Sequence, residues 1–282
     1  MPGFRGWGWR GPGPPLGVPF NLNTQSPQAQ GLVAWWPPLG SAGANVLQDF
    51  GGRGFTGTFN GTLAWQVDSM MGAVPNYDGA TTYVTTNKAL IPLTGNFTIT
   101  QWFSSTNTVT NTHLVAQYEA VIPTASGRFL TEINRVSQKY GCFHGSGAGV
   151  ITSAASFSTA GPNLMVIRRA GNTFSLFLNG VQDASTGSSD VGIQDTATWI
   201  GVGRGIPNFG YFPGQIGDIR IYNRALSAAE VWQQWAPESR FDLYRPLLRR
   251  LWTVPSVAGW AFNPVWDGRG VIGSSVITGV RP

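Results

Sequence analysis

The chain has 282 residues, of which 42% are hydrophobic, and this composition supports a sizeable folded core and excludes wholesale disorder. Only 11% of the residues are charged, whereas glycine (38), tryptophan (12) and phenylalanine (16) are abundant, as is typical of sandwiches or barrels of short strands. The net charge of +5 lies at the two ends, because residues 31–236 carry ten basic and ten acidic side chains. A charge excess divided in this way makes a poor phosphate-binding face, so nucleic acid is not an expected partner.

The cysteine content and the hydropathy pattern indicate a cytoplasmic site of folding. Cys142 is the only cysteine, so no intrachain disulfide forms and no oxidising compartment is required. The N-terminal residues lack the apolar stretch of about 7–15 residues that marks a secretory signal, and no apolar run reaches the ~18 residues that span a bilayer. We therefore expect folding and assembly in a host cytoplasm, with no secretion signal and no membrane partner.

Residues 1–30 form the first segment, which is rich in glycine and proline. Proline removes backbone donors and prevents regular helices and sheet ladders, so we predict an extended N-terminal arm over this segment. Isolated aromatic and basic side chains occur along the arm. We interpret Trp7, Trp9 and Arg10 as contacts to another protein surface.

Residues 31–236 form the second segment, in which short β-rich runs recur between turn signals and predict an antiparallel sandwich. The runs include GLVAWWPPLG (31–40), TTYVTTN (81–87), NFTITQWFSST (96–106), RFLTEINRV (128–136), LMVIRRA (164–170) and IGDIRIYN (216–223). Two of them alternate along the strand. We expect Phe97, Ile99 and Gln101 to oppose Thr98, Thr100 and Trp102, and Ile216, Asp218, Arg220 and Tyr222 to oppose Gly217, Ile219, Ile221 and Asn223.

Two local signals lie near the end of this segment. Asn179-Gly180 predicts a two-residue hairpin turn, because both residues tolerate the positive φ angles of a type I′ loop. Residues Ala225–Trp235 form the one convincing helix, in which Ser227 and Glu230 have the spacing of a capping box. Pro237 is expected to end this helix.

Residues 237–282 form a second irregular segment, which we expect to be extended and to act as a docking arm. Aromatic and arginine side chains are the usual anchors at protein interfaces, and this segment is rich in both. The predicted contact residues are Tyr244, Arg249, Arg250, Trp252, Trp260 and Trp266.

Four stretches of the central segment resemble the laminin-G-like, concanavalin A-like jelly-roll family, in the subset common in bacterial and phage proteins. They are similar to the family's first strand (31–40), its aspartate-then-glycine loop (48–61), its aromatic-Asp-Gly strand (71–84, with Tyr77, Asp78 and Gly79) and its closing strand and helix (212–231). The resemblance implies an all-β, antiparallel jelly-roll sandwich with one short helix, flanked here by the two extended arms.

The resemblance also implies a calcium site at the rim of the sandwich, and it places the carboxylates at Asp49 and Asp218. Calcium takes about six to eight oxygen ligands, which two carboxylates and loop carbonyls could supply as a weak site. The family's closing strand often carries two consecutive acids, but Gly217 occupies the first position here. In the alternative reading, Asp49 makes an Asx turn in its loop and Asp218 holds the sheet edge. Calcium is the one candidate cofactor.

Sugar chemistry on this architecture takes two forms. Glucanases use two carboxylates about 5 Å apart, and because none of the four glutamates of the chain is paired in this way we predict no enzymatic activity. Exposed aromatic rings could instead stack on a glycan. The candidates are Trp35, Trp36, Trp65 and Tyr211, with burial in the core as the alternative for most of them.

Two further motifs are interpreted as structural. Cys142 and His144 are too few for a zinc site, so we expect a buried thiol beside a surface histidine. The glycine-rich run GVGRG (201–205) is followed by no helix that could present backbone amides to a phosphate. We expect this run to bend the chain out of a strand.

These observations favour a non-enzymatic virion structural protein, either a capsid decoration protein or a head/tail fibre-type appendage. The arms would dock on other virion proteins, such as the major capsid or tail protein, and on neighbouring subunits in a small cyclic oligomer. The sandwich would face outward and adhere weakly to glycans. The alternative is a bacterial or phage carbohydrate-binding lectin or adhesin, which could depend on calcium.

Overall fold

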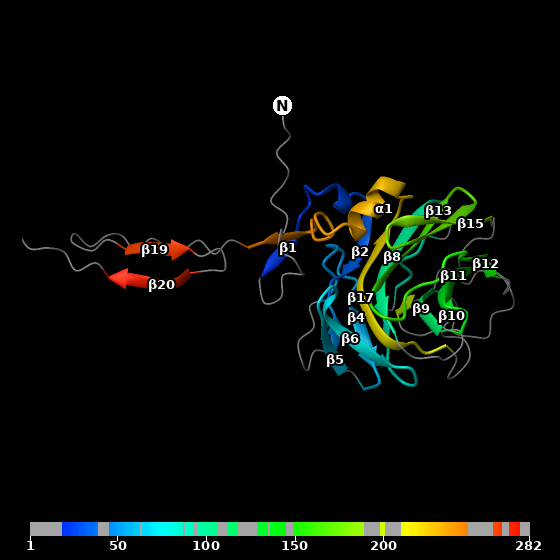
Figure 1. Cartoon of the computed structure of the whole chain (residues 1–282), viewed down its shortest axis with the longest axis horizontal. Helices are drawn as coiled ribbons and strands as arrows, with labels where there is room; N and C mark the ends of the chain where they lie inside the picture. The colour runs from blue at the N-terminus through cyan, green and yellow to red at the C-terminus, as the bar shows by residue number, and fades with distance from the viewer. Residues whose placement is uncertain are drawn as a thin grey trace, which may run out of the picture. The chain divides into compact units, whose positions relative to one another are not determined.

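The computed structural model describes most of the central chain and parts of both ends (Figure 1). The described residues are 19–38, 45–62, 64–86, 88–92, 95–105, 112–117, 129–134, 136–144, 149–188, 198–200, 210–247, 262–266 and 271–276. The chain divides into two compact units, Met1–Pro246 and Leu247–Pro282.

The first unit is a sandwich of two eight-stranded sheets, and every described strand pairing is antiparallel. Sheet I has the order β15 (Val181–Ser188), β14 (Thr173–Leu178), β13 (Asn163–Ala170), β8 (Phe97–Ser104), β17 (Pro213–Tyr222), β6 (Gly72–Asp78) and β5 (Ala64–Asp68), and β2 (Leu32–Trp36) also pairs with β17. Sheet II has the order β12 (Gly149–Thr152), β11 (Lys139–His144), β10 (Phe129–Asn134), β9 (Thr112–Gln117), β16 (Thr198–Ile200), β7 (Tyr83–Thr85), β4 (Gly57–Asn60) and β3 (Val46–Leu47).

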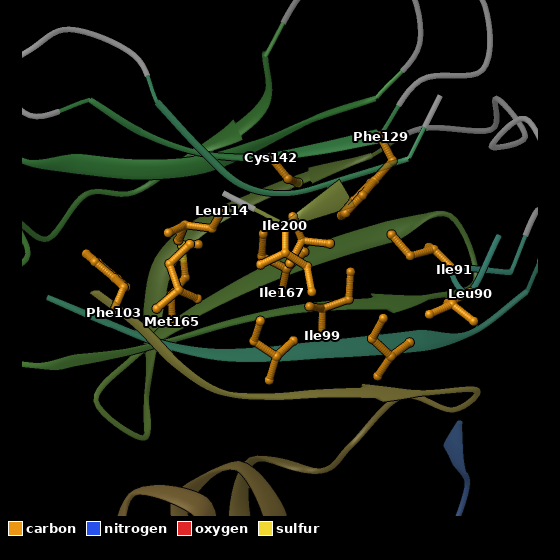
Figure 2. Close-up of a cluster of buried hydrophobic side chains, with 14 of the residues drawn as sticks. Leu90, Ile91, Ile99, Phe103, Leu114, Phe129, Cys142, Met165, Ile167 and Ile200 are labelled. Carbon is orange, nitrogen blue, oxygen red and sulfur yellow. The ribbon is translucent and has the colours of Figure 1, made fainter. Parts of the chain in front are cut away.

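The main core lies between the two sheets, where side chains from both inner faces meet (Figure 2). The predicted alternation of β8 is confirmed, because Phe97 and Ile99 belong to this core whereas Trp102 belongs to a second cluster outside sheet I. Cys142 contributes to the core from sheet II, as expected for a buried thiol. Burial raises the pKa of this thiol well above its ordinary value, so the group remains protonated.

Strand β17 departs from the predicted alternation. Ile216 packs in the main core together with Ile219 and Ile221, although an unbroken strand would place Ile216 on the opposite face from the other two. The register of β17 against β8 shifts between Ile216 and Ile219, and this irregularity turns the strand over. Beyond the shift the even-numbered side chains, Arg220 among them, face away from the core as predicted.

The predicted hairpin is confirmed, and the predicted helix is confirmed with a later start, at Ala228 and not at Ala225. Asn179 and Gly180 have φ angles of 52° and 82°, and Leu178 pairs with Val181 across the turn. Helix α1 spans Ala228–Trp235 and is capped by Ser227, with both hydrogen bonds of the capping box present. The helix packs on the outer face of sheet I, where Trp235 stacks on Trp102 with ring centroids 5.3 Å apart.

The boundaries of the two predicted arms require correction. Strand β1 (Phe20–Leu22), the 3₁₀ turn η1 (Pro27–Ala29) and strand β18 (Tyr244–Pro246) all belong to the first unit. Phe20 and Tyr244 are buried in the second cluster, which covers the outer face of sheet I. The ring of Tyr244 packs on Trp35 with ring centroids 4.8 Å apart, so Tyr244 is a core residue and not a docking contact.

The second unit contains a hairpin that the sequence interpretation did not anticipate. Strands β19 (Phe262–Trp266) and β20 (Val271–Val276) pair in antiparallel register, with Trp266 opposite Val271. The other predicted arm contacts, Trp7, Trp9, Arg10, Arg249, Arg250, Trp252 and Trp260, lie outside the described residues. Within the described part of the chain, no helix is long and apolar enough to cross a membrane.

Candidate functional site

Asp49, the first predicted calcium ligand, closes the loop that follows β3. Its Oδ1 accepts hydrogen bonds from the backbone N–H of Trp35 (3.0 Å) and of Gly51 (2.7 Å), and its Oδ2 accepts one from Phe55 (2.9 Å). The side chain is buried. Asp49 therefore anchors its glycine-rich loop to strand β2, which is the Asx-type role considered as the alternative to calcium.

Asp218, the second predicted ligand, forms a buried ion pair with Arg220 on the outer side of sheet I. The guanidinium donates from Nε at 2.9 Å and from Nη2 at 2.7 Å, and the indole N–H of Trp35 donates to Asp218 Oδ1 at 3.0 Å. Although desolvation alone would lower the pKa of Arg220, the carboxylate of Asp218 raises it well above its ordinary value. Arg220 thus remains charged, and its charge is neutralised by Asp218.

Arg220 also holds both terminal segments on the sandwich. Its Nη1 donates to Gln28 Oε1 at 2.6 Å, and its Nη2 donates to the carbonyl of Arg240 at 2.9 Å. Gln28 in turn donates to the carbonyl of Ser239 at 2.7 Å. The network therefore joins β17 to η1 and to the segment after α1, and it explains how an arginine is accommodated at 2% exposure.

The geometry of this region does not fit the calcium site. All four oxygens of Asp49 and Asp218 already accept hydrogen bonds from protein N–H groups, and the guanidinium beside Asp218 would repel a cation. Across the residues that the structure describes, no three histidine, cysteine, aspartate or glutamate side chains gather as a metal-binding group.

The four aromatic residues predicted to bind glycans fall into different environments. Trp35 and Trp36 are 0% and 1% exposed and lie in the two clusters on either side of β2, so neither offers a ring face to a ligand. Trp65 is half-buried against Phe59, with ring centroids 5.8 Å apart. Tyr211 is half-buried beside Tyr83, at 6.3 Å between centroids. Of the four, Tyr211 is the one on the side of sheet II.

The outer face of sheet II carries a histidine and a glutamate that the sequence interpretation missed. Glu132 on β10 is the register partner of His113 on β9, and His113 Nε2 lies 3.4 Å from Glu132 Oε2. The histidine is buried, whereas 13% of the glutamate side chain is exposed. No local motif joins these residues, because only the pairing of two distant strands brings them together.

The two tyrosines lie at the same end of this face. The carbonyl of Gly210 accepts a hydrogen bond from the His113 backbone N–H at 2.9 Å, so Tyr211 directly follows the residue that packs on the histidine. Tyr83 and Thr85 flank the core residue Val84 on β7 and therefore point outward. We name Tyr83, His113, Glu132 and Tyr211 the sheet II outer site.

The loop after β6 leads into this site and is closed by hydrogen bonds to Asp78. Its carboxylate accepts hydrogen bonds from the backbone N–H groups of Ala80, Thr81 and Thr82 and from the Thr81 hydroxyl. Partial burial alone would raise the pKa of Asp78, but these bonds hold it well below its usual range. The aromatic-Asp-Gly motif thus forms a hydrogen-bonded loop that leads into Tyr83.

The sheet II outer site combines two half-buried rings with one carboxylate. Ring faces stack on apolar faces of a ligand, and a carboxylate accepts hydrogen bonds from hydroxyl groups. Glu132 is the only acidic residue in the described strands of sheet II, whereas glycoside hydrolysis uses a pair of carboxylates. The arrangement therefore offers stacking faces and one hydrogen-bond acceptor to a hydroxylated ligand.

Two further sequence motifs and one small pocket complete the description. The side chain of His144 and the run 201–205 lie outside the described residues. Met70, Met71, Trp102 and Arg240 line a pocket beside the Asp218–Arg220 pair, but it has room for about one water molecule.

Three solved structures illustrate the likeness of the fold. The chain superposes on the Trypanosoma rangeli sialidase in complex with the inhibitor DANA (TM-score 0.53, 13% identity, 72% of this chain and 32% of that chain). It also superposes on domain 4 of AbnA, a GH43 extracellular arabinanase from Geobacillus stearothermophilus, in complex with arabinotriose (TM-score 0.54, 18% identity, 73% of this chain and 98% of that chain). A third is the binding domain of botulinum neurotoxin DC in complex with SialylT (0.55, 11%, 74% and 52%).

These likenesses establish the fold alone, and the chain spans about a third of the sialidase and half of the toxin domain. No curated protein sequence matches the chain. The family model described as the concanavalin A-like lectin/glucanases superfamily matches residues 78–232, which is more than half of the chain. The chain therefore belongs to the concanavalin A-like lectin/glucanase superfamily.

Proposed function

We propose that this protein is a non-enzymatic adhesion component of a virion, attached through the sequences on either side of residues 19–247 and binding glycans through the sheet II outer site. The proposal assigns attachment to one side of the sandwich and recognition to the other. The terminal segments and α1 pack on the outer face of sheet I, whereas Tyr83, His113, Glu132 and Tyr211 lie on sheet II.

The pairing of β1 with β18 is the observation that carries the proposal. Phe20, the first residue of β1, is the register partner of Pro246, the last residue of β18. The chain before Phe20 and the chain after Pro246 therefore join the sandwich at a single point. Such a point is suited to a tether that leaves the opposite sheet accessible, and the flanking sequences contain the arginine and aromatic residues that anchor protein interfaces.

Glycan recognition is supported by the family and by the composition of the site. The arabinanase domain was solved in complex with arabinotriose, and the toxin binding domain was solved in complex with SialylT. The single carboxylate in the described strands of sheet II supports binding without hydrolysis. Tyr211, alone among the predicted glycan contacts, belongs to this site.

The glycan-binding half is tested with the full chain on an array that includes sialylated and arabinose-containing oligosaccharides. We expect Tyr211→Ala to weaken binding about tenfold, because the loss of one stacking contact is worth roughly 1 kcal/mol or slightly more. Trp232→Ala is the matched control, since Trp232 is 47% exposed on α1, on the sheet I side. No binding by the wild-type chain, or equal loss in both variants, contradicts this half.

The attachment half is tested on virus particles purified by density gradient from cultures that express the gene. We expect peptides of this chain to co-purify with the particles, and limited proteolysis of intact particles to release a fragment close to residues 19–247. Peptides found only in the soluble fraction, together with glycan binding, would instead indicate a free lectin or adhesin. These two results separate a failure of attachment from a failure of recognition.

A further inference from the structure

Strand β5 forms one edge of sheet I and exposes apolar side chains. Among the described strands, only β6 pairs with it. Val67 is 76% exposed, and Ala64 and Gln66 are exposed as well. Trp65 is half-buried and shares the face of Val67, so an indole and an isopropyl group lie side by side at the margin of the sandwich.

Edge strands are templates for pairing with another chain unless a short length, a charge, a proline or a bulge protects them. Among the described strands of sheets I and II there are five edges, and four of them carry such a feature or are covered. Strand β2 pairs only with β17, and its free side is covered by the loop after β3, because Trp35 bonds there to Asp49 and Phe50. Strand β3 has two residues, and the pairings of β12 with β11 and of β15 with β14 each contain a register shift. Strand β5 has five residues, no lysine and no proline, and its register with β6 is unbroken. The one charge of β5 is Asp68 at its last position, and β5 alone among these edges has neither a covering loop nor a register shift nor a short length.

The sequence of β5, Ala-Trp-Gln-Val-Asp, is complementary to itself when it is read in the opposite direction. Antiparallel pairing about Gln66 places Trp65 opposite Val67 of a second copy, and Val67 opposite its Trp65. Aromatic and β-branched side chains are favourable cross-strand partners. The same register places Asp68 opposite Ala64, so no like charges face each other.

We propose that β5 pairs with β5 of a second copy of this chain, in a two-fold symmetric dimer that continues sheet I across both copies. We name a second copy as the partner because the β5 sequence is complementary to itself, as a two-fold symmetric interface requires. Asp68 does not interfere, since its Oδ1 already accepts hydrogen bonds from the N–H groups of Met70 (2.7 Å) and Met71 (2.8 Å). The dimer does not depend on the proposed function, because β5 lies in sheet I and the glycan site in sheet II.

Gln66 faces Gln66 of the second copy at the centre of the proposed interface. Charges introduced there can therefore be used to test the dimer by sedimentation velocity on the full chain. The side chain of Gln66 is exposed and accepts a hydrogen bond from Gln215 at 2.5 Å on the surface, so substitutions there should not disturb folding. We expect a dimer for wild type and at least about tenfold weaker association for Gln66→Lys and for Gln66→Glu, because each places like charges opposite each other. Mixing the two variants should restore the dimer.

The matched control is Gln182→Lys, which adds the same charge to an exposed position of β15, the opposite edge of sheet I. It should sediment as wild type. A monomeric wild-type chain, unchanged association of Gln66→Lys, or a mixture that stays dissociated would each overturn the proposal.

If other surfaces also associate, sedimentation alone does not isolate the β5 interface. Disulfide crosslinking tests that interface directly. Gln66→Cys should form a disulfide-linked dimer under mild oxidation, because the two cysteines face each other on the two-fold axis. The native Cys142 is buried and does not compete. Gln182→Cys is the control and should remain uncrosslinked, and equal crosslinking of the two variants would also overturn the proposal.

Discussion

The outer faces of the two sheets contrast in how their polar groups are used. On sheet I, Asp218, Arg220 and Trp35 bond to one another and to the terminal segments, which bury them. On sheet II, Glu132 retains 13% exposure beside His113, and Tyr211 is half-buried. The difference teaches that a residue's chemistry does not decide its role. The carboxylates and indoles predicted to bind ligands on the sheet I side, Asp49, Asp218, Trp35 and Trp36, are instead buried and stabilise the fold.

The largest effect is expected at the buried ion pair of sheet I. Asp218→Ala leaves the Arg220 guanidinium buried with its charge unpaired, and it removes the acceptor of the Trp35 indole. We expect the free energy of unfolding to fall by about 3–5 kcal/mol. Denaturant unfolding monitored by tryptophan fluorescence measures the loss.

The control for this prediction removes both charges. The double variant Asp218→Ala/Arg220→Met should be more stable than Asp218→Ala alone, because no uncompensated charge remains. A loss below about 1 kcal/mol for the single variant would contradict the structural role of the pair and would weaken the contrast between the two faces.

A smaller loss in the free energy of unfolding is expected at Gly210, which packs against His113 of the sheet II outer site. Gly210 has φ +74°, and a Cβ added there would overlap the imidazole of His113. Gly210→Ala should therefore cost about 1–3 kcal/mol and displace the ring or the loop that carries Tyr211. Denaturant unfolding gives the loss, and the glycan array shows whether binding weakens too. Gly95→Ala is the control, because Gly95 also has a positive φ (+91°) but meets no neighbouring atom.

Local signals predicted the elements that depend on neighbours in the sequence. The capping box of Ser227 and Glu230 and the turn at Asn179-Gly180 are complete within four residues, and the structure confirms both. The jelly-roll sandwich was predicted from the combination of such signals with the family's motifs, and it is confirmed.

Features that depend on distant pairing were not predicted. The sequence contains no sign that Phe20 meets Pro246, so the terminal residues were assigned to arms. The irregularity in β17 is likewise invisible in an alternating pattern, and it moves Ile216 to the core. Trp35 and Trp36 are both buried because clusters lie on both sides of β2, which composition cannot show.

A modest, pH-dependent effect is expected at the start of α1. The hydrogen bond from Arg224 is the main cause that lowers the pKa of Glu230 to about 2. Because the folded-state pKa lies below the ordinary value, the stabilisation is present at neutral pH and is lost as pH falls from about 4.5 towards 2. Glu230→Gln should cost about 0.5–1 kcal/mol at pH 7, allowing for screening of this exposed pair, and almost nothing near pH 2. Urea unfolding at both pH values measures the difference; an equal cost at both would contradict it.

The smallest effect is expected from calcium. The family resemblance implies a calcium site at Asp49 and Asp218, whereas the structure uses these carboxylates as hydrogen-bond acceptors within the sheet I side of the sandwich. If the oxygens of Asp49 and Asp218 are committed to protein N–H groups, millimolar Ca²⁺ or EDTA should leave the melting temperature of the full chain unchanged. A rise with Ca²⁺ that Mg²⁺ does not reproduce would contradict this expectation. Asp49→Asn then locates the site, since the amide keeps one acceptor for the loop but removes the negative charge that a cation requires. A calcium response that survives Asp49→Asn would place the ion elsewhere and leave the structural role of the sheet I carboxylates intact.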